Sequence, residues 1–382
     1  MKKTILAGAV ALAVLPLSAT AAIPLYEEGD LSFTTDGYIN AFYVHQDVDR
    51  PGTALDRNQS RVKMGFLPNY LGFNVANRVG DLNFGARASF WVTINDSSDA
   101  GTATAIDVRQ FYGTVGGDWG EVTLGKDFGL FARSNILRDE LLSGFGHASD
   151  LMGILNWGGV SFGNIGSGYP YAFPSAQITY RMPTVAGFNL AVGVLDPYDT
   201  TDASQVGGAS YQDSPRVESE ISYTNSFGDA ELYAWVNGAW QHSRNTDPLV
   251  DSVTSSGVGY GVQMKVQDLS VTVSGFNADG MHPFFTNNLG QASLQEVDSK
   301  GHLAQIGYQF GKLRAAASYG RTQDDGLVTG NRLKLTHTAL QLSYAVTPQF
   351  TLVANGGRFE ARDGGVKAEE TDTVAVGAAL SW

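Results

Sequence analysis

The sequence predicts an all-β fold: a transmembrane antiparallel β-barrel of about sixteen strands, with one long loop folded into its lumen. Three observations support this fold class. Apolar and polar residues alternate along most of the chain. Short turns alternate with long polar connections between the candidate strands. After an N-terminal apolar run, no segment approaches the roughly 18 consecutive apolar residues that a membrane-spanning helix needs.

The first residues predict export from the cytoplasm. Lys2 and Lys3 precede an apolar run over 5–17, and small residues follow at 18–21. This pattern is typical of a secretory signal peptide, here 1–21, with cleavage after Ala21. The alternative of a membrane anchor is disfavoured because the apolar run is too short to span a bilayer. We therefore expect residues 22–382 to form one domain, the barrel itself.

Composition excludes several classes of protein. The chain contains 46 glycines and no cysteine, which argues against a small secreted scaffold held by disulfides. Loss of the two positive charges of Lys2 and Lys3 changes the formal net charge from −13 to −15. A mature chain this acidic is not expected to bind nucleic acid.

The alternation is clearest over residues 82–94. One face would carry only apolar side chains, and the other would carry mostly polar or small ones. Apolar residues facing lipid and polar residues facing water suit a membrane barrel. A β-sandwich would turn the apolar face inward instead, and alternation alone does not distinguish the two. The apolar set is Leu82, Phe84, Ala86, Ala88, Phe90, Val92 and Ile94.

Turn residues divide the rest of the chain into sixteen candidate strands. Tight turns such as 80–81, 117–118 and 311–312 alternate with long polar loops near 48–59, 127–174, 196–214, 242–256, 278–300, 322–332 and 360–370. This asymmetry is typical of an outer-membrane barrel with short periplasmic turns and long external loops, whereas a sandwich would have more even loops. The predicted strands are 31–47, 60–77, 82–95, 105–116, 119–126, 175–182, 187–195, 215–225, 229–241, 257–267, 269–277, 301–310, 313–321, 333–344, 349–359 and 371–382.

The last strand predicts how the barrel closes. Every second residue back from Trp382 is apolar, through Leu380, Ala378, Val376 and Val374, so this face would meet lipid. The strand must pair with the first one, because a spanning sheet cannot leave an open edge. Sixteen strands would enclose an aqueous channel rather than a packed core.

The longest loop, 127–174, is too long for an idle surface connection. Folding it into the lumen would bury its aromatic residues against the wall and present its carboxylates to the channel. The alternative is a solvated external flap. The aromatic residues are Phe128, Phe131, Phe145 and Trp157, and the carboxylates are Asp139, Glu140 and Asp150.

Several segments resemble the Gram-negative general porins, a family of trimeric outer-membrane channels with sixteen strands. The resemblance lies in Ser60-Arg61, in the run from Val108 to Gly113 continuing through 117–126, in 178–181, and in the terminal Trp382. It implies a multi-pass protein of the Gram-negative outer membrane, surrounded by lipid and lipopolysaccharide. It further implies a homotrimer that lets small hydrophilic solutes and ions diffuse passively.

The resemblance also implies a charged constriction. In the family, acidic residues of the third loop face a ladder of basic residues across water, and here Arg61, Lys126 and Arg181 match the ladder. Arg87 is inward by the alternation of its strand and would join them. Candidate loop acids are Asp139, Glu140 and Asp150. The terminal Trp382 would mark the chain for the barrel assembly machinery.

The sequence contains few motifs that indicate catalysis or metal binding. The six histidines are scattered without metal-ligand spacing, so we expect no metal, no cofactor and no enzymatic activity. An outer-membrane hydrolase and an adhesin or structural barrel are the alternatives from other classes. Within the channel class, a substrate-specific porin competes with a general diffusion pore, because the long loop is rich in aromatic residues.

Overall fold

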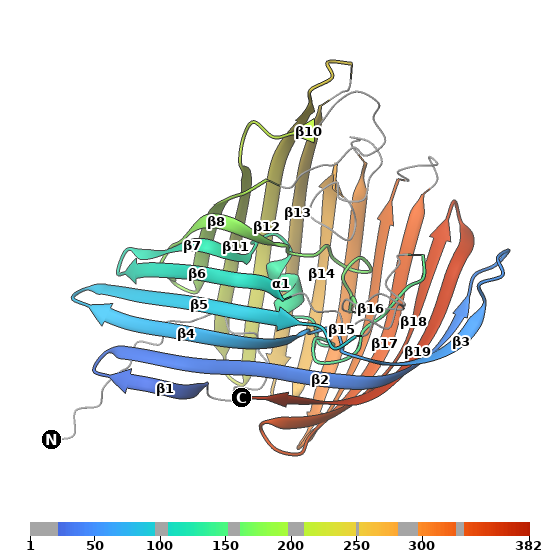
Figure 1. Cartoon of the computed structure of the whole chain (residues 1–382), viewed down its shortest axis with the longest axis horizontal. Coiled ribbons are helices and arrows are strands. Elements are labelled where there is room, and N and C mark those ends of the chain that lie inside the picture. Colours follow the sequence, from blue (N-terminus) through green and yellow to red (C-terminus); the bar gives the residue numbers. More distant parts are fainter. Residues whose placement is uncertain are drawn as a thin grey trace.

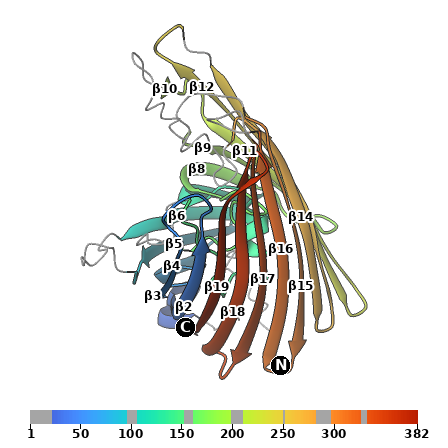
Figure 2. The same cartoon turned by 90° about the vertical axis from the view of Figure 1, so that its right-hand side faces the viewer.

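The structure is a computed structural model that describes residues 22–95, 106–151, 161–197, 210–249, 252–281, 297–325 and 332–382. The predicted signal peptide and Trp157 lie outside these residues. One antiparallel sheet contains all nineteen strands and curls into a closed ring. Strands of one wall cross those of the other at a steep angle, as tilted barrel strands do (Figures 1 and 2). No helix of the described residues is long and apolar enough to cross a bilayer.

The strands follow the chain order around the ring. The first half contains β1 Ile23–Glu28, β2 Leu31–Asp49, β3 Arg57–Lys63, β4 Asn69–Val79, β5 Leu82–Val92, β6 Asp107–Gly117, β7 Gly120–Phe128, the short helix α1 Arg133–Leu137, β8 Pro174–Arg181, β9 Phe188–Leu195 and β10 Ser210–Tyr211. The second half contains β11 Arg216–Phe227, β12 Ala230–Asn245, β13 Val253–Val266, β14 Leu269–Asp279, β15 Ser299–Phe310, β16 Leu313–Asp324, β17 Leu333–Ala345, β18 Phe350–Asp363 and β19 Val366–Ser381.

Sixteen barrel strands result, as the sequence predicts. β3 and β4 both pair with β2 and form two parts of one barrel strand. β10 and β11 likewise share β12 as a partner. β1 is an additional strand that pairs with the beginning of β2. The predicted closure is confirmed, because β19 pairs with β2 from Glu370 opposite Asp49 to Ser381 opposite Tyr38.

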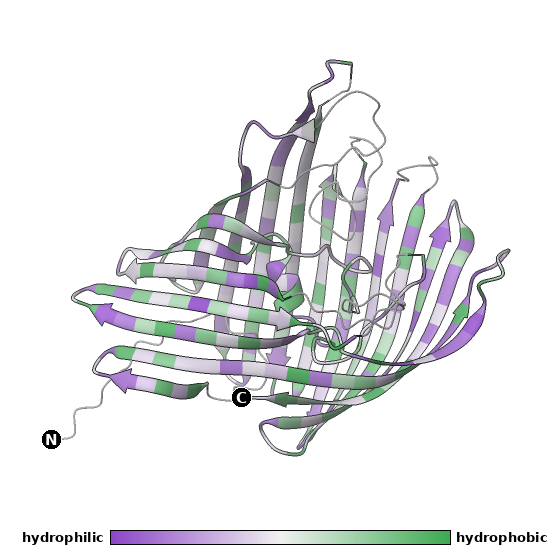
Figure 3. Cartoon of the chain, viewed as in Figure 1, coloured by the Kyte–Doolittle hydropathy of each residue, from purple (hydrophilic) through white to green (hydrophobic). Residues whose placement is uncertain are grey.

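The two faces of the sheet differ as predicted, and hydrophilic and hydrophobic residues alternate along the strands in Figure 3. On β13, Val258, Tyr260 and Val262 are exposed on the outer face, while Gly259 between them and Gln263 beyond them are buried. Exposed apolar residues and buried small or polar ones alternate in this way along most strands. The apolar face therefore lies outside, as in a membrane barrel and unlike a sandwich.

Three local features differ from the prediction. The expected loop at 360–370 is a tight hairpin, because Gly364 and Gly365 both adopt positive φ angles and turn the chain directly from β18 into β19. β1 was not expected, since its residues lack clean alternation. The predicted strand at 60–77 is interrupted at 64–68, where the chain leaves the ladder. There the side chain of Asn40 bonds the Gly65 N–H (2.6 Å) and the Leu67 carbonyl (2.8 Å).

Candidate functional site

The connection between β7 and β8, which we call the inner loop (129–173), lies against the inner face of the sheet. Its hydrogen bonds reach strands from β11 around to β19 and on to β3. The wall side chains that it contacts are the buried ones, which alternate with the exposed apolar residues. The loop therefore occupies part of the lumen. Residues 152–160 lie outside the described part of the chain.

The loop first docks on β11–β14. The Glu218 carboxylate accepts the Phe131 N–H (2.9 Å), and the Ser134 hydroxyl in α1 donates to Glu220 (2.7 Å). The Phe131 ring packs in a cluster with Phe276 and other buried residues of β12–β14. It comes so close to Gly257 that a Cβ there would lie 2.7 Å from the ring. Small residues on the wall thus allow the loop to approach the sheet.

Asp139 lies in the centre of the loop and is buried. It accepts hydrogen bonds from Asn164 (2.9 Å), Tyr169 (2.5 Å) and Gln305 of β15 (2.7 Å). Burial raises the pKa of its carboxyl above the usual range, while these hydrogen bonds act in the opposite direction. Asp139 therefore joins the two limbs of the loop to each other and to the wall.

Glu140 and Asp150 also bind the wall. Glu140 forms an ion pair with Arg314 of β16, and its backbone N–H donates to Gln305 (3.0 Å). Asp150 pairs with Arg57 (2.8 Å) and Arg50 (3.4 Å) near the other end of the docked segment. The hydrogen bond from Arg57 holds the pKa of the Asp150 carboxyl below its usual range.

These contacts differ from the sequence-based expectation. Asp139, Glu140 and Asp150 were expected to face cations across open water, but each is hydrogen-bonded to a neighbouring group. The physical reason is that a loop folded into a lumen has to replace the water around its charged groups, and the wall supplies partners. The three acids hold the loop in place.

Among the predicted basic residues, Arg61, Arg87 and Arg181 lie on the inner face. Arg61 is opposite the buried Val44, and Arg181 is opposite Ala191, which is also buried. Arg87 forms an ion pair with Asp36 of β2 (2.8 Å), and its guanidinium also donates hydrogen bonds to Asn74 and Gln110. It is therefore part of a buried polar network.

Lys126 lies on the opposite face, contrary to the prediction. Its neighbours across the sheet are Phe111 and Ala176, which are both exposed on the outer face, as is Leu124 on its own strand. The match to a family motif identified the position, but the alternation along β7 decides the face. Lys126 is therefore not part of the inner wall.

Sequence reasoning missed two arginines that the inner loop itself contributes. Arg133 begins α1 and pairs with Asp127 at 3.3 Å. Arg138 follows α1 and lies over the Tyr233 ring, 4.0 Å from its centroid. Their signal in the sequence is their position in the same loop as the three acids.

An apolar cluster fixes the loop on its other side. Phe66 and Leu67, in the interrupted part of the second barrel strand, pack with Leu142, Ile165 and Tyr169 of the loop. The Phe66 N–H donates to the Gly144 carbonyl (2.9 Å). The strand interruption thus provides a docking point for the loop.

Two histidines lie together at the loop–wall contact. His147 of the loop stacks on Phe359 of β18, with ring centroids 4.6 Å apart, and lies 5.0 Å from His337 of β17. Burial lowers the pKa of His147 to about 4, so its ring is neutral at neutral pH. His147 Nε2 lies 3.4 Å from the Ile165 carbonyl.

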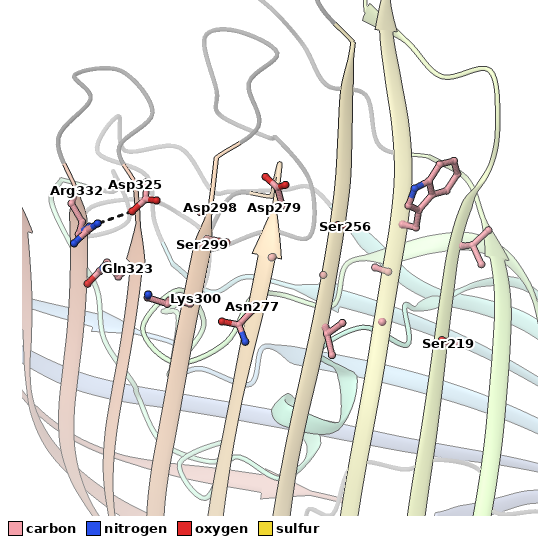
Figure 4. A pocket seen from close by; sticks show the side chains of 17 residues that line it. Ser219, Ser256, Asn277, Asp279, Asp298, Ser299, Lys300, Gln323, Asp325 and Arg332 are labelled. Carbon is pink, nitrogen blue, oxygen red and sulfur yellow. Dashed lines mark hydrogen bonds and ion pairs between the residues drawn. The ribbon is translucent and has the colours of Figure 1, made fainter.

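A further concavity lies on the outer face, at the upper ends of β11–β17 (Figure 4). Trp240 and Val258 form its apolar part, and charged residues from neighbouring strands form its rim. Arg332 pairs with Asp325 there at 3.2 Å. The rim carries charges of both signs, and among the described residues no group of three or more His, Cys, Asp or Glu could hold a metal ion.

Comparisons with known proteins agree with this architecture. A family model described as Gram-negative porin matches residues 8–364. No match was found among curated proteins. Among solved structures, the outer-membrane channel DcaP of Acinetobacter baumannii is similar with a TM-score of 0.70 at 15% identity, covering 94% of this chain and 100% of that one.

Two further solved structures have the same fold. An anion-selective porin from Comamonas acidovorans gives a TM-score of 0.65 at 16% identity, covering 92% of this chain and 100% of that one. OmpF of Salmonella typhi, in complex with daunomycin, gives a TM-score of 0.59 at 16% identity, covering 94% and 100%. At these identities the similarity concerns the fold alone.

Proposed function

Because the chain belongs to the Gram-negative porin family, we propose that it forms a water-filled channel for passive diffusion of small hydrophilic solutes and ions. Family and fold assign it to the outer membrane, which its strands cross repeatedly. The observation that carries the proposal is a closed ring of sixteen strands with an apolar outer face and a largely polar inner face. A ring of this size leaves room for water beside one inserted loop.

In this proposal the inner loop narrows the channel. Asp139, Glu140 and Asp150 fix the loop by their contacts with its own residues and the wall. Arg61 and Arg181 contribute positive charge on the inner face, and Arg87 supports the wall through its pair with Asp36. A docked loop with fixed charges is the arrangement that makes a wide barrel selective.

The assembled state in this proposal is a homotrimer in outer-membrane lipid and lipopolysaccharide, inserted by the barrel assembly machinery. A trimer form of the similar OmpT of Vibrio cholerae is known as a solved structure, with a TM-score of 0.56. The conducting unit is expected to be the single chain, because its ring closes on itself.

The experiment is conductance of the purified, folded protein in a planar bilayer. We expect openings in steps of three and currents proportional to voltage at low potentials. A folded protein that inserts into the bilayer and stays silent would refute the channel. Removal of 139–150 should increase the single-channel conductance if the inner loop narrows the channel.

A second candidate function is a substrate-specific porin. Arg109 lies over Trp91, 5.0 Å from the ring centroid, and donates to Tyr171 of the loop (3.1 Å), so the loop and wall form a structured aromatic and cationic surface. Liposome swelling with neutral sugars of increasing size distinguishes the two functions. A general pore gives rates that follow size alone.

A further inference from the structure

The charged groups around α1 fall into two sets by exposure. The carboxylates of Asp127, Glu218 and Glu220 are buried, with 4%, 2% and 5% of their surface exposed. Each is satisfied by near neighbours. Glu218 accepts from the Phe131 N–H and from Arg216, and Glu220 accepts from Ser134 and Asn237. Asp127 accepts from Gln110 (2.9 Å) and pairs with Arg133.

The arginines of the same region are more open. Arg133, Arg138 and Arg181 are all half-buried. Arg138 lies over the Tyr233 ring and is 3.4 Å from the Gln263 amide oxygen. Arg181 donates to the Asn189 amide oxygen (2.9 Å).

Neutral groups orient the guanidiniums of Arg138 and Arg181, whereas the charge of Arg133 is paired with that of Asp127. Among the described residues, no carboxylate lies within the 4.0 Å of an ion pair from Arg138 or Arg181. Glu121, the neighbour of Arg181 across β7 and β8, is the half-buried carboxylate of this region. Among the described residues near α1, the guanidiniums that no ion pair neutralises are therefore those of Arg138 and Arg181.

We propose that Arg138 and Arg181 form a cation-lined constriction that selects small anions such as carboxylates and phosphate. The proposal rests on the channel function and deepens it by naming the class of solute. The positive charge of the constriction follows from burial, because docking of the loop covers the acids and leaves the arginines in contact with the lumen. Guanidinium suits this role because it stays charged beside other cations and presents a planar set of donors that matches carboxylate and phosphate.

The arrangement differs from opposed charges across an eyelet. Here the loop contributes Arg138, directly after α1, and the wall contributes Arg181 of β8. Two cations beside the path of an ion lower the energy of an anion and raise that of a cation. Selection should therefore depend on arginines of the loop as well as of the wall.

The test is the reversal potential of the channel in a tenfold KCl gradient across a planar bilayer. The wild-type channel should prefer chloride over potassium. Arg138→Gln and Arg181→Gln should each reduce the chloride-to-potassium permeability ratio severalfold, and the double variant should reduce it further. Arg138→Lys and Arg181→Lys keep the charge and should retain most of the preference.

The matched control is Arg321→Gln, which removes the same charge from the outer face of β16, where Arg321 donates to Gln323. It should leave the ratio unchanged. A wild-type preference for potassium would overturn the proposal and needs no variant. An unchanged ratio in a conducting double variant would overturn it as well.

A wild-type protein without any conductance would instead refute the channel function itself. Added malonate or inorganic phosphate should lower the chloride current of the wild type more than that of the double variant. An equal loss of chloride current in the wild type and the double variant would contradict anion binding at these arginines.

Discussion

At the scale of single residues, the inner loop depends on groups that are kept uncharged as well as on ion pairs. His147 stacks on Phe359 beside His337 and has no room for the water that a protonated ring would need. Its pKa is lowered to about 4, against about 6.5 for an exposed histidine. The stability that the neutral ring provides is therefore complete above about pH 6.5 and falls as the pH drops toward 4. The full contribution of the neutral ring to the free energy of folding is about 3 kcal/mol.

We predict that acid loosens the inner loop through His147. Proteolysis of the loop in detergent-folded protein should increase between pH 6.5 and 4, and His147→Phe should reduce this increase because phenylalanine can stack on Phe359 without taking up a proton. His302→Phe on the outer face is the control and should behave as the wild type. An increase of equal size in His147→Phe would assign the effect to other groups, of which His337, 5.0 Å from His147, is the first candidate.

The sequence predicted on which face of the sheet most residues lie, but it predicted few of the contacts between side chains. Alternation placed Arg87 inside, because a strand turns every second side chain to the same face. The same alternation puts Lys126 on the outer face, although the family resemblance implied an inner position. That Asp150 meets Arg57, 93 positions away in sequence, depends on the path of a loop through the lumen, which no local pattern encodes.

At the scale of elements, the inner loop docks where the wall lacks side chains. Gly257 of β13 leaves space for Phe131, and a Cβ there would lie 2.7 Å from its ring. Gly320 of β16 is even closer to the loop backbone at Ser167. Wall glycines thus decide how closely the loop can approach.

We predict that Gly257→Val displaces Phe131 and destabilises docking of α1 by about 1–3 kcal/mol, the usual cost of overpacking. The single-channel conductance should become noisier, and the loop should become easier to cleave. Gly356→Val is the matched control, since a Cβ at Gly356 of β18 meets nothing within 4 Å. If both variants behave alike, strand propensity rather than docking explains the effect.

Strand positions followed from the sequence more closely than the connections did. Alternation and turn residues were sufficient for β5 or β16, whereas the hairpin at Gly364 and Gly365 was read as a long loop because its flanking strands carry many charges. Those charges form ion pairs with one another, such as Arg358 with Asp372 (2.6 Å). The interruption at 64–68 depends on contacts with the inner loop, which the local sequence does not reveal.

At the scale of the whole molecule, the two ends of the chain close the barrel. The backbone of Trp382 both donates to and accepts from Gly37 (3.2 and 3.0 Å). Its indole covers Gly37 so closely that any Cβ there would clash. The last residue thus completes the ladder between β19 and β2.

We predict that deletion of Trp382 impairs assembly more than conductance. The deletion removes the final pair of backbone hydrogen bonds and the aromatic cover of Gly37, so the fraction of folded, trimeric protein in the outer membrane should fall severalfold. The few channels that do form should conduct normally. Trp382→Phe keeps an aromatic ring and serves as the control. Normal amounts of inserted trimer in the deletion variant would contradict the prediction.

Closure of the barrel has a consequence inside the lumen. Phe145 of the inner loop packs against Phe42 and Val44 of β2, Val353 of β18 and Ala375 of β19. These strands lie on both sides of the seam at which the first and last barrel strands meet. The site for Phe145 is therefore incomplete until the most distant parts of the sequence have paired. A middle segment of the chain can reach its final place only after the two ends have met, so docking of the inner loop follows closure of the barrel.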